Sequence, residues 1–240
     1  MFLENYHQPL PQGFAFSREQ ASHFAKGVAA DFNPIHDEDA KRFCVPGDLL
    51  FAVLLSRIGL HQKMHCYFSG MVGSDVGLQI DLKQDEARII DSAGKEYLDL
   101  TFAGDNTHDA VLIEKVVRRY VRFSGQNFPP ILVPLMREKG VMVNPARPLV
   151  MYQSMAIELD SVDLKDPVIT FSHATMDVVG KRGNAHLHFD CIDGGKVVGR
   201  GEKLMLLSGV VAYEQAEMDK MVAFYNGRKE SYTGNISELP

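Results

Sequence analysis

The segment from Leu49 to Ile58 is apolar on nearly every side, and Gly59 follows it directly. Its spacing predicts a helix that ends at this glycine and has Asp48 as its N-cap. A helix that is apolar all round has no face that can remain in water, so other elements normally wrap it. We therefore expect the rest of the chain to enclose this helix.

Helices and strands are predicted on both sides of this segment. Ser17 and Gln20 form a capping box that starts an earlier helix, and Asn33-Pro34 disfavours its continuation beyond Ala30. Further helices are predicted over 37–43, 131–139 and 214–225 from turn residues and apolar spacing. Alternating apolar and polar residues predict strands over 13–16, 64–72, 76–82, 87–91, 96–102, 111–123, 150–159, 167–176, 184–191 and 197–208.

The order of these elements, a helix followed by four or five strands, occurs twice along the chain. A long antiparallel sheet curled around one apolar helix resembles the hotdog fold. The pattern therefore predicts an α+β protein with a double hotdog, in which two antiparallel sheets each wrap a central apolar helix. We place the first domain at residues 1–112, and the second, with the C-terminal helix and tail, at residues 113–240.

Charge and cysteine content exclude several classes of protein. The net charge is −6 and the isoelectric point about 5.8, which argues against general nucleic-acid binding, because that needs a basic surface. Cys44, Cys66 and Cys191 are far apart and form no CxxC pair, which is typical of a reducing compartment, so we expect a cytoplasmic protein. The N-terminal residues do not resemble a signal peptide, and no apolar run reaches the length of a membrane span.

The segment Asp31-Phe32-Asn33-Pro34-Ile35-His36 carries the strongest chemical signal in the chain. Pro34 makes a rigid turn after the end of a helix, and Asp31 and His36 flank that turn. Such a turn can bring a carboxylate and an imidazole toward one point, where they form a usable acid–base pair near neutral pH. The alternative is that Asp-x-Asn-Pro is a helix-ending Asx turn and that His36 is a surface histidine.

This segment resembles the signature of MaoC-like (R)-specific enoyl-CoA hydratases, also called hydratase 2 enzymes. The positions that match are Asp31, Asn33, Pro34, Ile35 and His36. The resemblance implies a lyase of fatty acid metabolism that hydrates a trans-2-enoyl thioester, with Asp31 and His36 activating the water and Asn33 orienting either the water or the histidine. It also implies that the N–H of Gly47, at the start of the apolar helix, polarises the thioester carbonyl.

The resemblance covers roughly residues 24–59 and is incomplete. The glycine that usually precedes the aspartate is Ala30, and the segment from His36 to Gly47 is shorter than is usual in the family. Two other functions therefore stay open. One is an acyl-CoA thioesterase of the hotdog type, with Asp31 or Asp48 as its carboxylate, and the other is a non-catalytic protein that binds acyl-CoA or a lipid.

We expect an acyl-CoA or acyl-carrier thioester as partner, no cofactor, no nucleic acid and no membrane span; the sequence leaves a homodimer open. His186, His188 and Asp190 alternate along a predicted strand and share one of its faces. We interpret them as the polar outer face of a sheet and expect no metal, because no fourth ligand is evident.

Overall fold

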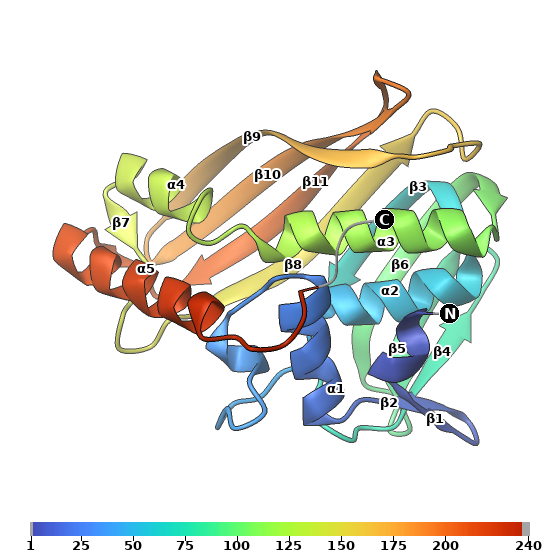
Figure 1. The fold of residues 1–240 in the computed structure, drawn as a ribbon, viewed down its shortest axis with the longest axis horizontal. Coiled ribbons are helices and arrows are strands. Elements are labelled where there is room, and N and C mark those ends of the chain that lie inside the picture. Colours follow the sequence, from blue (N-terminus) through green and yellow to red (C-terminus); the bar gives the residue numbers. More distant parts are fainter. Residues whose placement is uncertain (1, 237–240) are drawn as a thin grey trace.

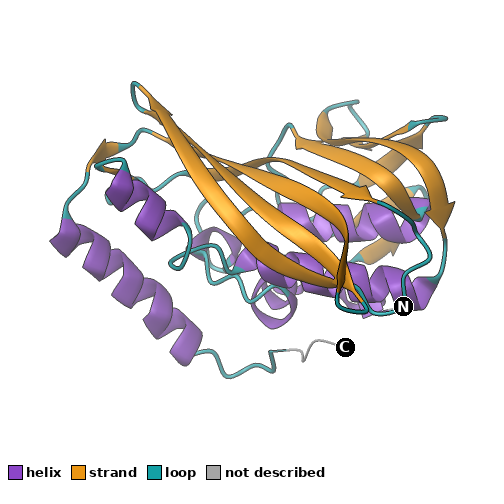
Figure 2. Ribbon diagram, turned by 90° about the horizontal axis from the view of Figure 1, so that it is seen from above, coloured by secondary structure: helices purple, strands orange, loops and turns teal. Residues whose placement is uncertain are grey.

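A ten-stranded antiparallel sheet forms the main layer of the chain in the computed structural model, which describes residues 2–236 (Figure 1). Helices cover one face of this sheet (Figure 2), so the predicted α+β class is confirmed. The sheet strands are β1 Gln8–Leu10, β2 Gly13–Ala15, β3 Leu60–Phe68, β4 Leu78–Leu82, β5 Glu86–Asp91, β6 Glu96–Thr107, β8 Val150–Leu159, β9 Val168–Val179, β10 Arg182–Asp193 and β11 Lys196–Ser208.

Five α-helices and several shorter elements complete the chain. The short strands β7 Val141–Met142 and β12 Val211–Ala212 form a separate pair. The 3-10 segments are η1 Phe2–Tyr6 and η3 Pro34–His36, and η2 Phe24–Val28 is a π-helix. The α-helices are α1 Arg18–His23, α2 Gly47–Ile58, α3 Ala110–Gly125, α4 Leu132–Glu138 and α5 Gln215–Glu230.

The two halves of the sheet repeat one strand order. In the first half the neighbours run β4, β5, β6, β3, and in the second half they run β9, β10, β11, β8. Strand β3, which follows α2, pairs with β8, the first long strand after α3. The pairing is antiparallel and runs from Lys63 opposite Glu158 to Tyr67 opposite Ser154. This pairing joins the halves into one sheet, so the prediction of two separate sheets was wrong.

Helix α2 is wrapped as its composition predicted. All of its apolar side chains are buried, and they belong to the main hydrophobic core together with residues of α3 and the sheet. Helices α2 and α3 lie side by side on the same face of the sheet (Figure 1). Near the end of α3, a Cβ on Gly125 would lie 2.3 Å from the carbonyl oxygen of Ala29, so only glycine fits this close approach.

Three local predictions were wrong. Residues 111–123 form most of α3 rather than a strand, because Asp109 caps the first turn through the N–H groups of Val111 and Leu112 and one face packs into the core. Residues 37–43 form turns. Asp48 lies inside the first turn of α2, and Pro46 is the N-cap. The domain boundary at 112/113 falls inside α3 and stays a prediction.

The strand β10 alternates as predicted. His186, His188 and Asp190 are half-buried on one face, while Leu187 and Phe189 are buried on the other. On this face the His186 ring bonds to Glu202 and the His188 ring stacks on His173 at 4.3 Å. Within residues 2–236 no three such side chains are placed to hold a metal ion, and no helix is both long and apolar enough to cross a membrane.

Candidate active site

The motif turn begins where the first helical segment ends. Ala30 adopts a left-handed backbone with φ of 53°, and the N–H of Asp31 donates to Ala25 O at 2.8 Å. Asp31 Oδ1 accepts the N–H of Asn33 at 2.9 Å, and Asn33 Oδ1 accepts the N–H of Ile35 at 3.2 Å. Two successive side-chain to backbone bonds of this kind make a tight Asx-type turn. The alternative role of the motif as a helix-ending turn is thus also present.

The turn brings the two predicted catalytic side chains together. His36 Nε2 lies 3.6 Å from Asp31 Oδ2, and His36 Nδ1 lies 2.7 Å from the carbonyl oxygen of Cys44. A carbonyl can only accept, so Nδ1 carries the proton, and a neutral His36 then presents the lone pair of Nε2 toward Asp31. Two acceptors at this separation can share a water that donates one hydrogen to each.

The C-terminal helix α5 holds this turn from outside. The N–H of Phe32 donates to the hydroxyl of Tyr225 at 3.3 Å, and the rings of the two residues meet edge to face. Arg228, one turn further along α5, forms an ion pair with the buried carboxylate of Asp37. Lys26 approaches the other oxygen of Asp37 at 3.0 Å. The position of the motif therefore depends on residues at the far end of the chain.

The N-terminus of α2 lies at the same site. Pro46 O accepts the N–H groups of Leu49 and Leu50, whereas the N–H groups of Gly47 and Asp48 have no acceptor in the part of the chain that the structure describes. Unpaired N–H groups at a helix start can stabilise an oxyanion. A Cβ on Gly47 would lie 3.0 Å from the Phe68 ring, so a larger residue would displace that ring.

A cavity of about 720 Å³ connects these groups. Its polar part contains Asp31, His36, Gly47 and Asp48 from the first half, together with Ser124 and Lys203. The remaining wall is largely apolar, and much of it comes from α4, α5, β11 and the segment before β8. Its apolar members include Leu132, Met136, Val143, Met205, Met221 and Phe224. Elements of the second half thus supply a large share of the cavity wall, beside Cys44, Val45 and Pro46 from the short segment between His36 and Gly47.

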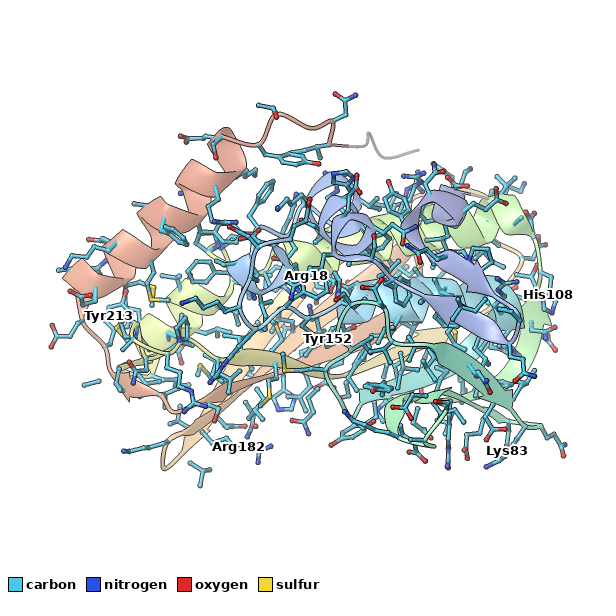
Figure 3. The ribbon with its side chains drawn as sticks, turned by 90° about the horizontal axis from the view of Figure 1, so that it is seen from below. Arg18, Lys83, His108, Tyr152, Arg182 and Tyr213 are labelled. Atoms are coloured by element: carbon cyan, nitrogen blue, oxygen red, sulfur yellow. The ribbon has the colours of Figure 1, made fainter. Side chains whose placement is uncertain are left out.

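A buried polar cluster lies on the inner side of the cavity. Ser124 Oγ donates to Asp48 Oδ2 at 2.6 Å, and Lys203 Nζ donates to Ser124 Oγ at 2.6 Å and to Ser124 O at 3.0 Å. Lys203 Nζ also lies 4.2 Å from the centre of the Tyr152 ring, which lies in the middle of the molecule (Figure 3). Burial raises the pKa of Asp48 and lowers the pKa of Lys203, while each charge opposes the other's shift.

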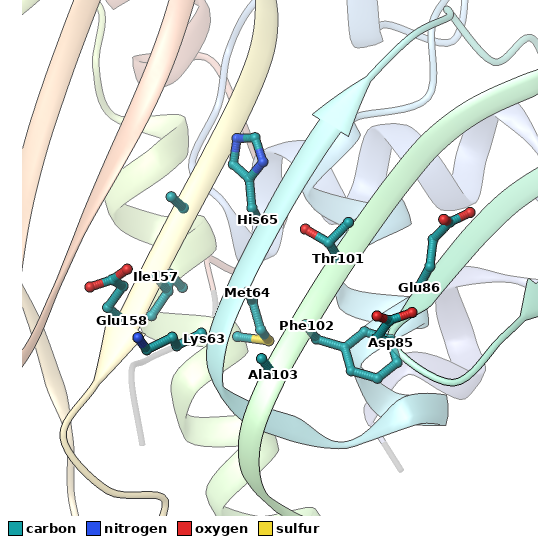
Figure 4. Close-up of a pocket in the computed structure, with 11 residues that line it drawn as sticks. Lys63, Met64, His65, Asp85, Glu86, Thr101, Phe102, Ala103, Ile157 and Glu158 are labelled. Carbon is teal, nitrogen blue, oxygen red and sulfur yellow. The ribbon is translucent and has the colours of Figure 1, made fainter.

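A second hollow of about 440 Å³ lies across β3, β6 and β8 (Figure 4). It contains the exposed side chains of Lys63, His65, Thr101 and Glu158, and none of the motif residues. His65 and Lys63 alternate along β3 with the buried Met64 and Cys66, so this hollow is on the face of the sheet away from the core.

The structure brings Asp31, His36 and Gly47 to one cavity, as the motif predicted, and leaves their catalytic roles as predictions. Asn33 lines the same cavity, but its carbonyl oxygen is used within the turn. Sequence reasoning missed Ser124 and Lys203. The position of Lys203 could have indicated the cluster, because it lies on the inward-facing, largely apolar side of β11. A buried lysine is rare unless it has a partner.

The chain matches one protein family by sequence and has low-identity similarity to several solved structures. The family model described as "Protein of unknown function (DUF3581)" matches residues 1–216. No curated protein has a matching sequence.

Among solved structures, the acyl-CoA thioesterase II TesB2 of Mycobacterium marinum is 10% identical, with a TM-score of 0.44, over 70% of this chain and 91% of that chain. A MaoC-like dehydratase is 9% identical, with a TM-score of 0.43, over 88% of this chain and 98% of that one. The peroxisomal multifunctional enzyme type 2 of Drosophila melanogaster is 13% identical, with a TM-score of 0.41, over 80% of this chain and 47% of that one.

Proposed function

Because the chain belongs to the DUF3581 family of proteins of unknown function, we propose its function from its own site: it adds water to, or removes water from, an α,β-unsaturated acyl thioester. The observation that carries the proposal is the pair of acceptors formed by Asp31 Oδ2 and His36 Nε2, which are 3.6 Å apart beside a largely apolar cavity. A water bound between them is placed to attack an alkene.

Each residue of the motif has a role in this reaction. Asp31 takes a proton from the water as its oxygen bonds to the β-carbon of the thioester. His36, fixed by the carbonyl of Cys44, orients that water through Nε2, and the proton taken by Asp31 then passes to the α-carbon. The N–H of Gly47, with the positive end of α2 behind it, stabilises the enolate oxygen. Asn33 shapes the turn that holds the pair.

For the whole chain we propose a double hotdog fold in which the two units share one sheet. The repeated strand order, the antiparallel pairing of β3 with β8, and the parallel roles of α2 and α3 as the main helix of each half support it. The substrate is an acyl-CoA or acyl-carrier thioester, since the apolar wall suits an acyl chain and the polar end suits the thioester.

Asp31→Asn tests the proposal. It keeps the size of the side chain and removes the base, so we expect hydration of crotonyl-CoA or a longer enoyl-CoA to fall by about 10²–10⁴-fold. The exposed Asp39→Asn, in the neighbouring turn, is the matched control and should leave the rate unchanged. A wild-type protein that binds acyl-CoA tightly in calorimetry without hydrating any enoyl-CoA would contradict the proposal and support a binding protein.

A further inference from the structure

The buried cluster on the inner wall of the cavity has the geometry of an activated serine. Ser124 Oγ lies 2.6 Å from a carboxylate oxygen of Asp48 and 2.6 Å from the ammonium nitrogen of Lys203. The three side chains come from the end of α3, the first turn of α2 and the middle of β11. They belong to a buried network, with relative exposures of only 3%, 6% and 3%, yet all three line the cavity.

The hydrogen bonds define the direction of proton transfer. Lysine can only donate, so Ser124 Oγ accepts from Lys203 and gives its own proton to Asp48. A hydroxyl held between a base and a cation is the arrangement that makes serine a nucleophile. Burial raises the pKa of Asp48, which makes its carboxylate a stronger base than an exposed one.

Two further observations indicate that the cluster is open to a ligand. Asp48 Oδ1 is buried without a hydrogen-bond partner in the described part of the chain, and the same is true of Asn127 Oδ1. Asn127 also lines the cavity and donates to Ser124 O at 2.7 Å. Unpaired buried acceptors are costly, and a bound group with a donor would satisfy them.

We propose that Ser124 is a nucleophile of a second reaction in this cavity, the hydrolysis of an acyl thioester through an acyl-serine. Ser124 Oγ bonds to the thioester carbonyl carbon while its proton passes to Asp48. The carbon–sulfur bond then breaks, and the thiol leaves with that proton. A water next bonds to the carbonyl carbon and gives a proton to Asp48, the bond to Oγ breaks, and Ser124 regains the proton as the acid departs. The sum is a thioester and water giving an acid and a thiol.

The N-terminus of α2 also binds the carbonyl oxygen of the thioester in this second reaction. The unpaired N–H groups of Gly47 and Asp48 are at the same end of α2 as the Asp48 carboxylate, so a carbonyl oxygen bound there brings its carbon toward Ser124. Lys203 is a positioning residue, because its ammonium holds Oγ and offsets the charge of Asp48. The proposal does not depend on hydration, because Asp31 and His36 take no part in it.

Mass spectrometry of the full chain after treatment with an alkyl fluorophosphonate tests the proposal, since this probe forms a stable bond with nucleophilic serines. We expect one adduct per chain, mapped to Ser124, and no adduct in Ser124→Ala. Ser56→Ala is the control, because Ser56 is a half-buried serine whose hydroxyl donates only to Val53 O at 2.7 Å. That variant should be labelled like the wild type.

Asp48→Asn should slow labelling by at least about 10²-fold, because the base is lost. With octanoyl-CoA, the wild type should release free thiol and Ser124→Ala should not. A folded wild-type protein that is not labelled at Ser124 and releases no thiol would overturn the proposal, and this result does not depend on the folding of any variant. Because labelling is read by mass, it stays informative whether or not the chain hydrates enoyl thioesters.

Discussion

Lys203→Met removes the only ammonium group bonded to the buried Ser124–Asp48 pair in the described part of the chain. The substitution deletes two hydrogen bonds to Ser124, of 2.6 and 3.0 Å, and leaves the Asp48 carboxylate without its opposite charge. Leaving a buried charge uncompensated in this way costs about 3–5 kcal/mol. For a chain of this size that loss corresponds to a fall in Tm of about 6–20 °C.

The double variant Asp48→Asn/Lys203→Met separates charge from packing. Both charges are then absent, so we expect it to lose less than half of the unfolding free energy that Lys203→Met loses, measured by urea denaturation with circular dichroism. The pH dependence gives a second check. Because burial raises the pKa of Asp48, protonation of this group is easier in the folded than in the unfolded chain, and loss of Lys203 raises that pKa further; the defect of Lys203→Met should therefore be smallest at acidic pH and grow toward neutral pH. Equal losses in the single and double variants, at every pH, would refute the charge coupling between Lys203 and Asp48 across Ser124.

Three further predictions follow from single positions. Ala30→Gly removes the backbone strain of a left-handed alanine, whereas Ala29 has a φ of −81° and Ala29→Gly removes no strain. Thermal unfolding should therefore show Ala30→Gly to be more stable than Ala29→Gly by about 1 kcal/mol. Equal Tm values would contradict the strain at Ala30. Gly47→Ala should lower the hydration rate by about 10²-fold through the clash with Phe68, and the added Phe68→Leu should recover part of it, as steady-state kinetics would show. Burial raises the pKa of Cys44 to about 11, so at pH 8 only about one thiol in a thousand is ionised and iodoacetamide should modify it only after unfolding; rapid alkylation of the folded chain would show the thiol to be accessible and ionised.

Much of the fold could be predicted because local pattern and tertiary environment agree. The capping box of Ser17 and Gln20 is present, and the strand predicted over 150–159 has the bounds of β8. Helix α3 was missed because its valines and isoleucine favour strands locally. Its buried residues Leu112, Val116, Val117 and Tyr120 nevertheless recur at helical spacing, and packing against α2 decides the outcome.

One part of the candidate site could be predicted from the sequence, and the other part depends on tertiary packing. Asp31 and His36 are close in sequence, so a turn alone brings them together, and the motif could predict that pairing. Asp48, Ser124 and Lys203 meet only because α2, α3 and β11 pack around one core, and no spacing in the chain encodes that meeting. The hydrogen bond from Phe32 N–H to the Tyr225 hydroxyl joins residues 193 positions apart, so the local sequence could not predict it either.

Reaction in D₂O followed by NMR and mass spectrometry tests the central claim most directly. If Asp31 and His36 add water across the double bond, wild-type protein should convert an enoyl-CoA to a 3-hydroxyacyl-CoA that carries one deuterium at the α-carbon, and Asp31→Asn should not. Recovery of unchanged enoyl-CoA from the wild type, or release of its thiol without deuterium at the α-carbon, would contradict the claim.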